Sequence, residues 1–249
     1  MRRRLIAGIT AGVVISAGAV VSGQLVAGAG AVTLPAASTA WQTCRVTLNG
    51  VPTTVDAKER TRTVVNGTGG SWATLGFYVR TDSACTFKRI MLVDSRVGYN
   101  GISNGLTRRQ GSGTTPSGTY SMSYAFGNSM KPPGTTIAYH RVKPGDFWVQ
   151  DQNSPYYNEL RNSALGGFLA TTTGANGSER LSDFTTQYAY ALIINFNRAP
   201  DRKIIGRGSG IFLHVNGTGA TAGCVSIGRT SLKTLMSYLR SGDRITISA

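Results

Sequence analysis

A histidine and a cysteine, His214 and Cys224, stand ten positions apart in "HVNGTGATAGCVSIGR", residues 214–229. These are two of the residue types that most often carry covalent chemistry. A cysteine nucleophile acts as its thiolate, and a histidine within hydrogen-bond reach generates that thiolate at neutral pH. The chain has only two histidines, so the base for Cys224 must be His214 or His140. Gly223 would let a substrate carbonyl approach the sulfur, and the N–H groups of Gly223 and Cys224 would hold the resulting oxyanion. The other interpretation is a simply buried cysteine beside an unrelated histidine.

The three cysteines indicate one disulfide and one free thiol if the chain is exported. Cys44 and Cys85 both lie in the N-terminal third, 41 positions apart. A bridge between them would close a loop worth about 4 kcal/mol of chain entropy. Cys224 is then the unpaired thiol, and a free thiol in an oxidising compartment is either buried or functional.

The N-terminus has the features of a secretory signal. Three arginines at positions 2–4 precede an uncharged, largely apolar run over residues 5–26, and Ala-Gly-Ala patterns suited to cleavage follow. We predict a signal peptide over residues 1–31, with an uncleaved membrane anchor as the alternative. Either alternative places the rest of the chain outside the cytoplasm.

The chain is strongly basic, but its charges are dispersed. Without the arginines at positions 2–4, 23 Lys and Arg stand against 11 Asp and Glu, a net charge of +12. Beyond position 4 the basic residues are dispersed, alone or in adjacent pairs. There is no basic region interleaved with aromatics, and no zinc-finger spacing occurs. We therefore expect no nucleic-acid partner and no metal site. Attraction to an anionic cell envelope, or solubility alone, accounts for the charge.

The elements that would position these side chains are mainly short strands. Residues 41–95 alternate apolar and polar residues between Gly and Asn turns, and residues 188–197 and 208–215 resemble buried strands. One helix is indicated by "TSLKTLMSYLRSG", where Leu residues and a Met recur at helical spacing. Thr230 or Ser231 would cap its start and Gly242 its end. We predict a mainly β fold with one C-terminal helix and few other short helices.

Three segments carry a family resemblance. "FLHVNGTGATAGCVSIGR" resembles the active-site signature of the L,D-transpeptidase (YkuD-like) catalytic domain: a histidine near a strand end, a glycine-containing loop, then Ser/Thr-x-Gly-Cys. The positions that match the signature are His214, Gly217, Thr221, Gly223 and Cys224. "GTTPSGTY" (113–120) resembles the Thr-Pro-x-Gly-x-aromatic element of that family, and "WVQDQNSPYYN" (148–158) is similar to a segment of its exported actinobacterial branch.

The resemblance also shows departures. Ala222 stands where the family often has a second histidine, and the loop between His214 and Cys224 is shorter than the commonest form. Ser226 replaces the usual arginine two positions after the cysteine, although Arg229 is close enough in sequence to take its place.

What the resemblance implies is an L,D-transpeptidase-like β-sandwich over residues 90–249, preceded by disulfide-linked β segments at 32–89. Those segments would form either a separate module or the first strands of the catalytic domain. The implied activity is acyl transfer from a peptidoglycan tetrapeptide stem through Cys224, with His214 as base, to a neighbouring stem amine (a 3→3 cross-link) or to water. No metal or organic cofactor is implied. We expect a monomer that acts on stem peptides in the cell wall, either secreted or membrane-anchored.

Further residues are candidates for substrate contacts, each with a structural alternative. They are Thr221, Arg229, Asn216, His140, Trp148 and Tyr157. Arg229 could bind a carboxylate or cap the helix, and Trp148 and Tyr157 could form a lid or pack a satellite core. Two other functions remain open: a non-catalytic relative that binds peptidoglycan through the same groove, and a general cysteine peptidase.

Overall fold

The computed structural model describes residues 41–249. The predicted signal peptide or anchor at 1–31 lies outside the described residues, as does the start of the segment at 32–89. The fold class is confirmed: the chain is mainly β, with one α-helix and three short 3-10 helices among the described residues. None of the helices in this part of the chain has the length and apolar character to cross a membrane.

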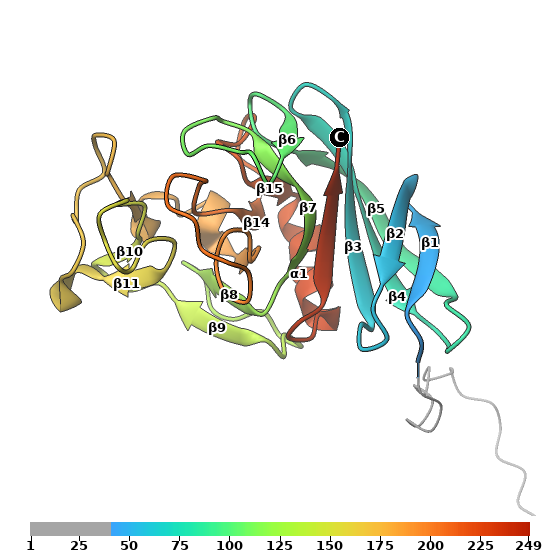
Figure 1. Ribbon diagram of the computed structural model, residues 1–249. Helices are drawn as coiled ribbons and strands as arrows, with labels where there is room; N and C mark the ends of the chain where they lie inside the picture. Colours follow the sequence, from blue (N-terminus) through green and yellow to red (C-terminus); the bar gives the residue numbers. More distant parts are fainter. Residues whose placement is uncertain (1–40) are drawn as a thin grey trace, which may run out of the picture. The chain divides into compact units, whose positions relative to one another are not determined.

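One large sheet of eleven strands dominates the fold (Figure 1). It is mixed: β7 and β6, β16 and β3, β14 and β15, and β8 and β9 pair in parallel, and the other neighbours are antiparallel. In spatial order the strands are β6 (Ile102–Asn104), β7 (Thr115–Ser121), β16 (Arg244–Ser248), β3 (Thr61–Gly69), β4 (Trp72–Arg80), β5 (Phe87–Arg96), β15 (Val225–Ile227), β14 (Phe212–Val215), β13 (Ala191–Ile193), β8 (Tyr124–Gly127) and β9 (Ala138–Arg141).

The N-terminal described residues divide between two sheets. β1 (Cys44–Leu48) and β2 (Val51–Val55) form a separate hairpin, whose turn places Asn49 and Gly50 at positive φ, as a tight two-residue turn requires. β3 and β4 lie within the large sheet and so share it with the strands of the expected catalytic segment. The predicted Cys44–Cys85 disulfide is confirmed, and it ties the hairpin to the loop between β4 and β5.

A third sheet is small and has three strands. It consists of β11 (Leu160–Asn162), β10 (Asp146–Trp148) and β12 (Glu179–Arg180), in that order. The 3-10 helices η1 (Ser163–Leu165), η2 (Leu181–Asp183) and η3 (Gln187–Ala189) adjoin it in sequence. η3 occupies the start of the predicted strand at 188–197, so that strand is shorter than expected and covers only β13.

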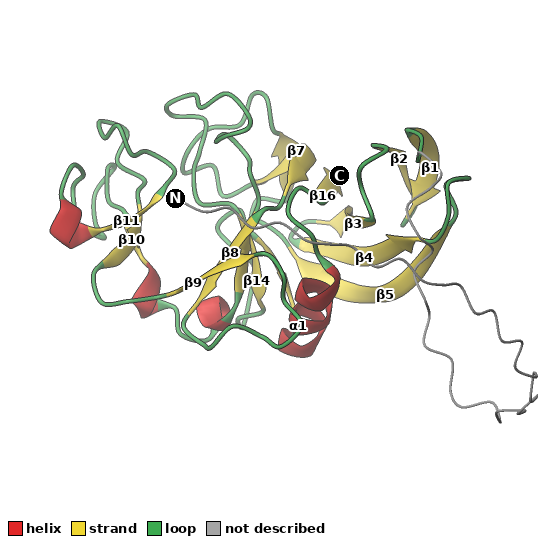
Figure 2. Cartoon of the chain, turned by 90° about the horizontal axis from the view of Figure 1, so that it is seen from below, coloured by secondary structure: helices red, strands yellow, loops and turns green. Residues whose placement is uncertain are grey.

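The single helix α1 (Arg229–Tyr238) packs against the large sheet (Figure 2). Its predicted apolar positions are all buried and join residues of β4, β14, β15 and β16 in the main core. They are Leu232, Leu235, Met236 and Leu239. The predicted caps are wrong, because the helix begins at Arg229 after Gly228 without a side-chain cap and ends before Leu239, ahead of Gly242.

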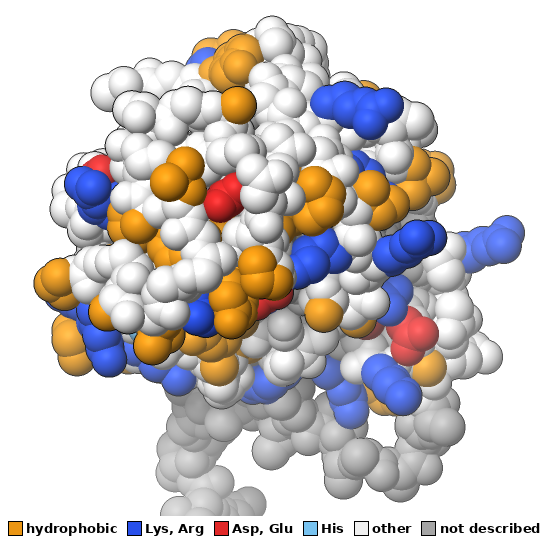
Figure 3. Space-filling model, turned by 60° about the vertical axis from the view of Figure 1, so that its left-hand side comes forward, with side chains coloured by type: hydrophobic (Ala, Val, Ile, Leu, Met, Phe, Trp, Pro, Cys, Tyr) orange, Lys and Arg blue, Asp and Glu red, His pale blue; other side chains and the backbone are white. Residues whose placement is uncertain are grey.

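The surface agrees with the charge pattern of the sequence. Figure 3 shows Lys and Arg side chains spread singly over the face in view, separated by apolar and uncharged side chains.

Candidate active site

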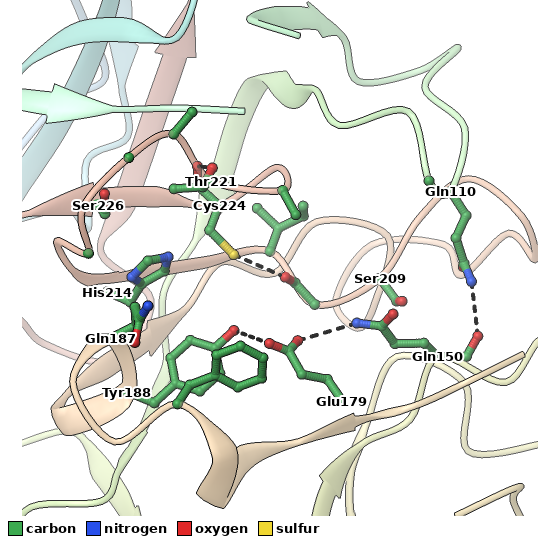
Figure 4. Close-up of a pocket in the computed structure, with 18 of the residues that line it drawn as sticks. Gln110, Gln150, Glu179, Gln187, Tyr188, Ser209, His214, Thr221, Cys224 and Ser226 are labelled. Atoms are coloured by element: carbon green, nitrogen blue, oxygen red, sulfur yellow. Dashed lines mark hydrogen bonds between the residues drawn. The ribbon is translucent and has the colours of Figure 1, made fainter. Parts of the chain in front are cut away.

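The two residues predicted to do chemistry, Cys224 and His214, line one pocket of about 470 Å³ (Figure 4). Its other walls come from the loop at 217–222, the segment around Arg108, and the segment from Glu179 to Tyr188. β14 ends just beyond His214, and β15 starts directly after Cys224. The two strands pair in parallel, with Leu213 opposite Val225, so the loop between them returns the chain to the start of β14 and places Cys224 beside Phe212, two residues along the strand from His214.

The thiol of Cys224 is held at the bottom of the pocket, where the residue is 8% exposed. Its Sγ donates to the carbonyl oxygen of Gly210 at 3.3 Å and accepts the N–H of Phe212 at 3.4 Å. Phe212 belongs to an aromatic cluster with Trp148 and Tyr188 that surrounds the sulfur from behind. The sulfur therefore lies between an apolar wall and an open pocket.

Two threonines fix the backbone that carries the sulfur. The hydroxyls of Thr221 and Thr115 both donate to the carbonyl oxygen of Cys224, at 2.6 Å and 3.1 Å. Thr115 also accepts the N–H of Gly98 at 2.8 Å. Thr115 belongs to the "GTTPSGTY" segment, so the two segments that the sequence analysis singled out meet at the cysteine. The side chain of Thr221 lines the pocket, and it also holds the cysteine loop through its hydrogen bond to the carbonyl oxygen of Cys224.

Position 223 requires glycine, both because of its backbone conformation and because neighbouring atoms leave no room for a side chain. Its φ of +141° lies in the region that only glycine adopts readily. A Cβ at this position would lie 2.8 Å from Nη2 of Arg108 and 3.0 Å from the carbonyl oxygen of Thr114. The N–H of Gly223 donates to Oγ1 of Thr221 at 3.2 Å. The N–H of Cys224 donates to no group of residues 41–249, so of the two predicted oxyanion donors this one is free in the structure.

His214 is held in a single tautomer. Its Nδ1 lies 2.8 Å from the carbonyl oxygen of Val215, and because a carbonyl can only accept, Nδ1 carries the proton. Nε2 is therefore the basic nitrogen. The edge of Tyr188 packs against the imidazole, with ring centroids 5.6 Å apart. Burial lowers the pKa of His214 to about 4, against the opposing effect of the bond to Val215, and the ring is neutral.

The thiol is neutral as well. Burial raises the pKa of Cys224 to about 12, and the nearby carboxylate of Glu179 raises it further, whereas the Phe212 N–H and Arg108 favour the thiolate. Among residues 41–249 the thiol's hydrogen bonds go to Gly210 and Phe212, and none joins it to His214. General-base catalysis by this pair would require the thiol proton to move to Nε2 as a carbonyl is attacked.

Two charged residues of the pocket were not predicted. Arg108 is 6% exposed, and it donates from Nε to the carbonyl oxygen of Thr114 at 2.7 Å and from Nη1 to that of Arg207 at 3.3 Å. Glu179 is half-buried, and burial raises its pKa to about 7. In the sequence, Arg108 is one of many dispersed basic residues, and Glu179 stands in a polar loop without any motif.

Two predicted contact residues lie in the interior instead of the pocket. Trp148 and Tyr157 are both fully buried. Trp148 donates from Nε1 to Oδ1 of Asn158 at 2.9 Å, and the hydroxyl of Tyr157 donates to Oε1 of Gln110 at 2.5 Å. Both residues pack in the interior, as in the satellite-core alternative, because neither ring is exposed where a ligand could contact it. Gln110 does line the pocket, so Tyr157 supports it from behind.

The remaining candidates do not line the pocket. His140 is on β9, where Nε2 lies 2.7 Å from Oδ2 of Asp146. Arg229 is exposed at the start of α1, with its guanidinium over the ring of Tyr190. Asn216 follows β14 and donates its backbone N–H to the carbonyl oxygen of Ile227. Residues 41–249 contain no group of three His, Cys, Asp or Glu side chains that could hold a metal ion.

Comparison with known proteins identifies the family. No curated protein matches the chain. Among solved structures, an L,D-transpeptidase from Mycobacterium smegmatis matches at 11% identity and a TM-score of 0.33, over 85% of this chain and 69% of that one. Residues 76–247 match the YkuD family, the L,D-transpeptidase catalytic domain, and this match includes the pocket, its cysteine and its histidine. The chain belongs to the L,D-transpeptidase catalytic domain family.

Proposed function

We propose that this protein is a peptidoglycan L,D-transpeptidase that forms 3→3 cross-links through a thioester on Cys224. The family acts on peptidoglycan stem peptides. The observation that carries the proposal is the placement of Cys224 and His214 in one pocket, with the imidazole fixed so that its basic nitrogen is Nε2. A nucleophile and a base with a defined tautomer are the minimum equipment for acyl transfer.

In the first step Sγ of Cys224 forms a bond with the carbonyl carbon of the third stem residue, and the thiol proton passes to Nε2 of His214. The oxyanion accepts the free N–H of Cys224. When the tetrahedral intermediate collapses, His214 returns the proton to the nitrogen of the terminal D-alanine, which leaves. The product is a thioester on the enzyme.

In the second step an amine of a neighbouring stem attacks the thioester carbon. His214 takes a proton from that amine and returns it to sulfur as the C–S bond breaks, which restores the thiol of Cys224. If water takes the place of the amine, the same steps give L,D-carboxypeptidase activity. Both steps need the thiol to leave the carbonyl of Gly210, to which it is bonded, and to exchange its proton with His214.

The departures from the family signature have structural consequences. Ser226 stands where the family has arginine, and Arg229 does not compensate because it lies on α1 outside the pocket. Arg108 instead brings a cation to the cysteine loop, against Gly223. Its charge favours the thiolate of Cys224, which is the electrostatic help that a buried thiol needs.

The Cys44–Cys85 disulfide supports export, because such bridges persist in oxidising compartments. We therefore place the activity in the cell wall, with a secreted or membrane-anchored protein. Stem peptides are the proposed partners.

The test is the reaction of the purified chain with a defined tetrapeptide stem, with D-alanine release and acyl-enzyme mass as readouts. We expect Cys224→Ser to abolish release while the fold is retained. His214→Gln should lower the rate by about 10² to 10⁴, the usual contribution of a general base. His140→Gln is the matched control, because that histidine lies outside the pocket, and it should keep the wild-type rate.

A second candidate function is non-catalytic binding of peptidoglycan in the same pocket. The observation that favours it is the bond of the neutral thiol to Gly210, away from His214. A carbapenem-type β-lactam separates the two functions. A covalent mass increase on the peptide that contains Cys224 would support the enzyme, whereas stem-peptide binding with an unreactive Cys224 would establish the binding protein.

A further inference from the structure

Glu179 is the single carboxylate among the described residues that line the Cys224 pocket. Its backbone is fixed, because β12 pairs with β10 and places Glu179 opposite the buried Trp148. Its side chain is fixed too: Oε1 accepts the hydroxyl of Tyr188 at 2.5 Å, and Oε2 accepts Nε2 of Gln150 at 3.3 Å. Figure 4 shows the carboxylate between these two groups, on the side of the pocket across from Thr221.

No cation neutralises this carboxylate. Within residues 41–249 no Lys or Arg nitrogen lies within 4.0 Å of it, although basic residues outnumber acidic ones in the chain. Arg108, the one cation of the described pocket wall, is bonded to backbone carbonyls. The adjacent Arg180 lies over the ring of Phe147 and 3.8 Å from Asp183. A half-buried carboxylate without a cation is unfavourable, and either protonation or a cationic ligand relieves this cost.

The position of Glu179 also opposes the proposed chemistry. The groups that face the thiol of Cys224 are Glu179, Arg108, Tyr188 and His214. His214 and Tyr188 are neutral, Arg108 favours the thiolate, and the carboxylate disfavours it. A positive charge bound at Glu179 would cancel this repulsion. Binding of a cation and ionisation of the sulfur are therefore coupled through one carboxylate.

We propose that Glu179, together with Gln150, forms a subsite for a primary ammonium group of the stem peptide, and that its occupation assists ionisation of the catalytic thiol. The subsite deepens the proposed function and rests on it. The ammonium donates to the carboxylate of Glu179 and to the side-chain oxygen of Gln150, once that amide has turned. The donor stem supplies such an ammonium while the thiol of Cys224 is free. The acceptor stem supplies one only after the thioester has formed, where it would instead assist departure of the thiolate, and the experiment below distinguishes the two sources.

The first experiment measures the thiol without any substrate. Alkylation of Cys224 by iodoacetamide is followed by mass across pH for wild type, Glu179→Gln and the matched control Glu159→Gln. Glu159 is paired with Lys203 outside the pocket. We expect Glu179→Gln to react faster at a given pH, by about tenfold for each unit by which the thiol pKa falls. The control should follow wild type. Equal rates for all three proteins would overturn the coupling.

The second experiment varies the ligand, so it does not depend on the variant alone. Two tetrapeptide stems are compared, one with a free side-chain amine on its third residue and one with that amine acetylated. Their binding to Cys224→Ser is measured by calorimetry, with and without Glu179→Gln. If the ammonium comes from the donor, the free amine binds at least about tenfold more tightly than its acetylated form, and Glu179→Gln removes the difference.

If the ammonium comes from the acceptor, the two stems bind and acylate Cys224 equally well as donors, and Glu179→Gln instead raises the KM for the acceptor amine. The subsite is overturned if neither the donor preference nor the acceptor KM depends on Glu179. The proposed function fails separately, when no acyl-enzyme or D-alanine is seen with either stem. In that case a Glu179-dependent preference in the calorimetry would still establish the ammonium subsite.

Discussion

His214 and Glu179 should make the stability of this protein depend on pH in opposite directions. Burial lowers the pKa of His214 from 6.5 to about 4, and burial raises the pKa of Glu179 from 4.5 to about 7. Neither group contributes to the shift of the other. Their effects on the free energy of unfolding should therefore add, and each can be removed by its own substitution.

The signs follow from which state binds the proton. Between about pH 4 and 6.5 the unfolded chain protonates His214 and the folded chain does not, so this contribution to stability is lost as the pH falls. Between 4.5 and about 7 the folded chain protonates Glu179 and the unfolded chain does not, so this contribution is lost as the pH rises. Each pair of pKa values differs by about 2.5, which corresponds to up to about 3 kcal/mol.

In wild type the two contributions oppose each other between about pH 4.5 and 6.5. The other titratable groups therefore determine how the wild-type free energy of unfolding changes with pH in this range. The assay is urea unfolding at pH 4.5 and 6.5, with the disulfide intact, for wild type, His214→Gln, Glu179→Gln and the double variant. Relative to wild type, we expect His214→Gln to lose stability as the pH rises and Glu179→Gln to gain it, each by about 2 to 3 kcal/mol. The double variant should regain the wild-type dependence.

Glu159→Gln serves as the control, because its carboxylate is on the surface and paired with Lys203. Groups shared by all variants cancel in the differences. Single variants whose curves run parallel to wild type would refute the reasoning, because the two side chains would then titrate in the folded protein as they do in the unfolded chain.

Other perturbations test the architecture of the site. Gly223→Ala should cost about 1 to 3 kcal/mol in chemical unfolding, because its Cβ would meet Nη2 of Arg108 at 2.8 Å and its φ is +141°; a stability equal to wild type would show that the loop relaxes freely. Arg108→Gln should slow alkylation of the Cys224 thiol, because the charge that favours the thiolate is lost; a faster reaction would contradict this. Reduction of Cys44–Cys85 should lower the melting temperature, because the disulfide closes a loop worth about 4 kcal/mol of chain entropy, while the reactivity of the Cys224 thiol is unchanged. An unchanged melting temperature after reduction would show that the disulfide does not stabilise the fold.

Local sequence was a good guide where the relevant partners are close in the chain. His214 and Cys224 are ten residues apart, and a strand that ends, a glycine-rich return and a second strand bring them together almost regardless of the rest. The apolar spacing of α1 likewise predicted which of its side chains enter the core. The helix caps were mispredicted because the chain leaves β15 at Gly228 and enters the helix directly, without the turn that a Ser or Thr cap would need.

The aromatic residues show where local pattern fails. Trp148 and Tyr157 are aromatic residues of the kind that form ligand-binding lids, and the same residue types also pack into buried clusters. Which of the two applies depends on what packs against them, and the packing of Phe212 against Trp148 joins segments 64 residues apart. No spacing in the sequence encodes that contact.

The sequence alone predicted the cysteine and the histidine that share the pocket, the disulfide and a mainly β chain, because each depends on residue type and spacing along the chain. Tertiary structure alone decided the charges around the sulfur. Arg108 reaches the cysteine loop across 115 positions, between Gly223 and Gly208, and Glu179 enters the pocket because β12 pairs with β10. Strand pairing over such distances is selected by the packing and hydrogen bonding of the whole sheet. The electrostatic setting of Cys224 is therefore a property of the fold.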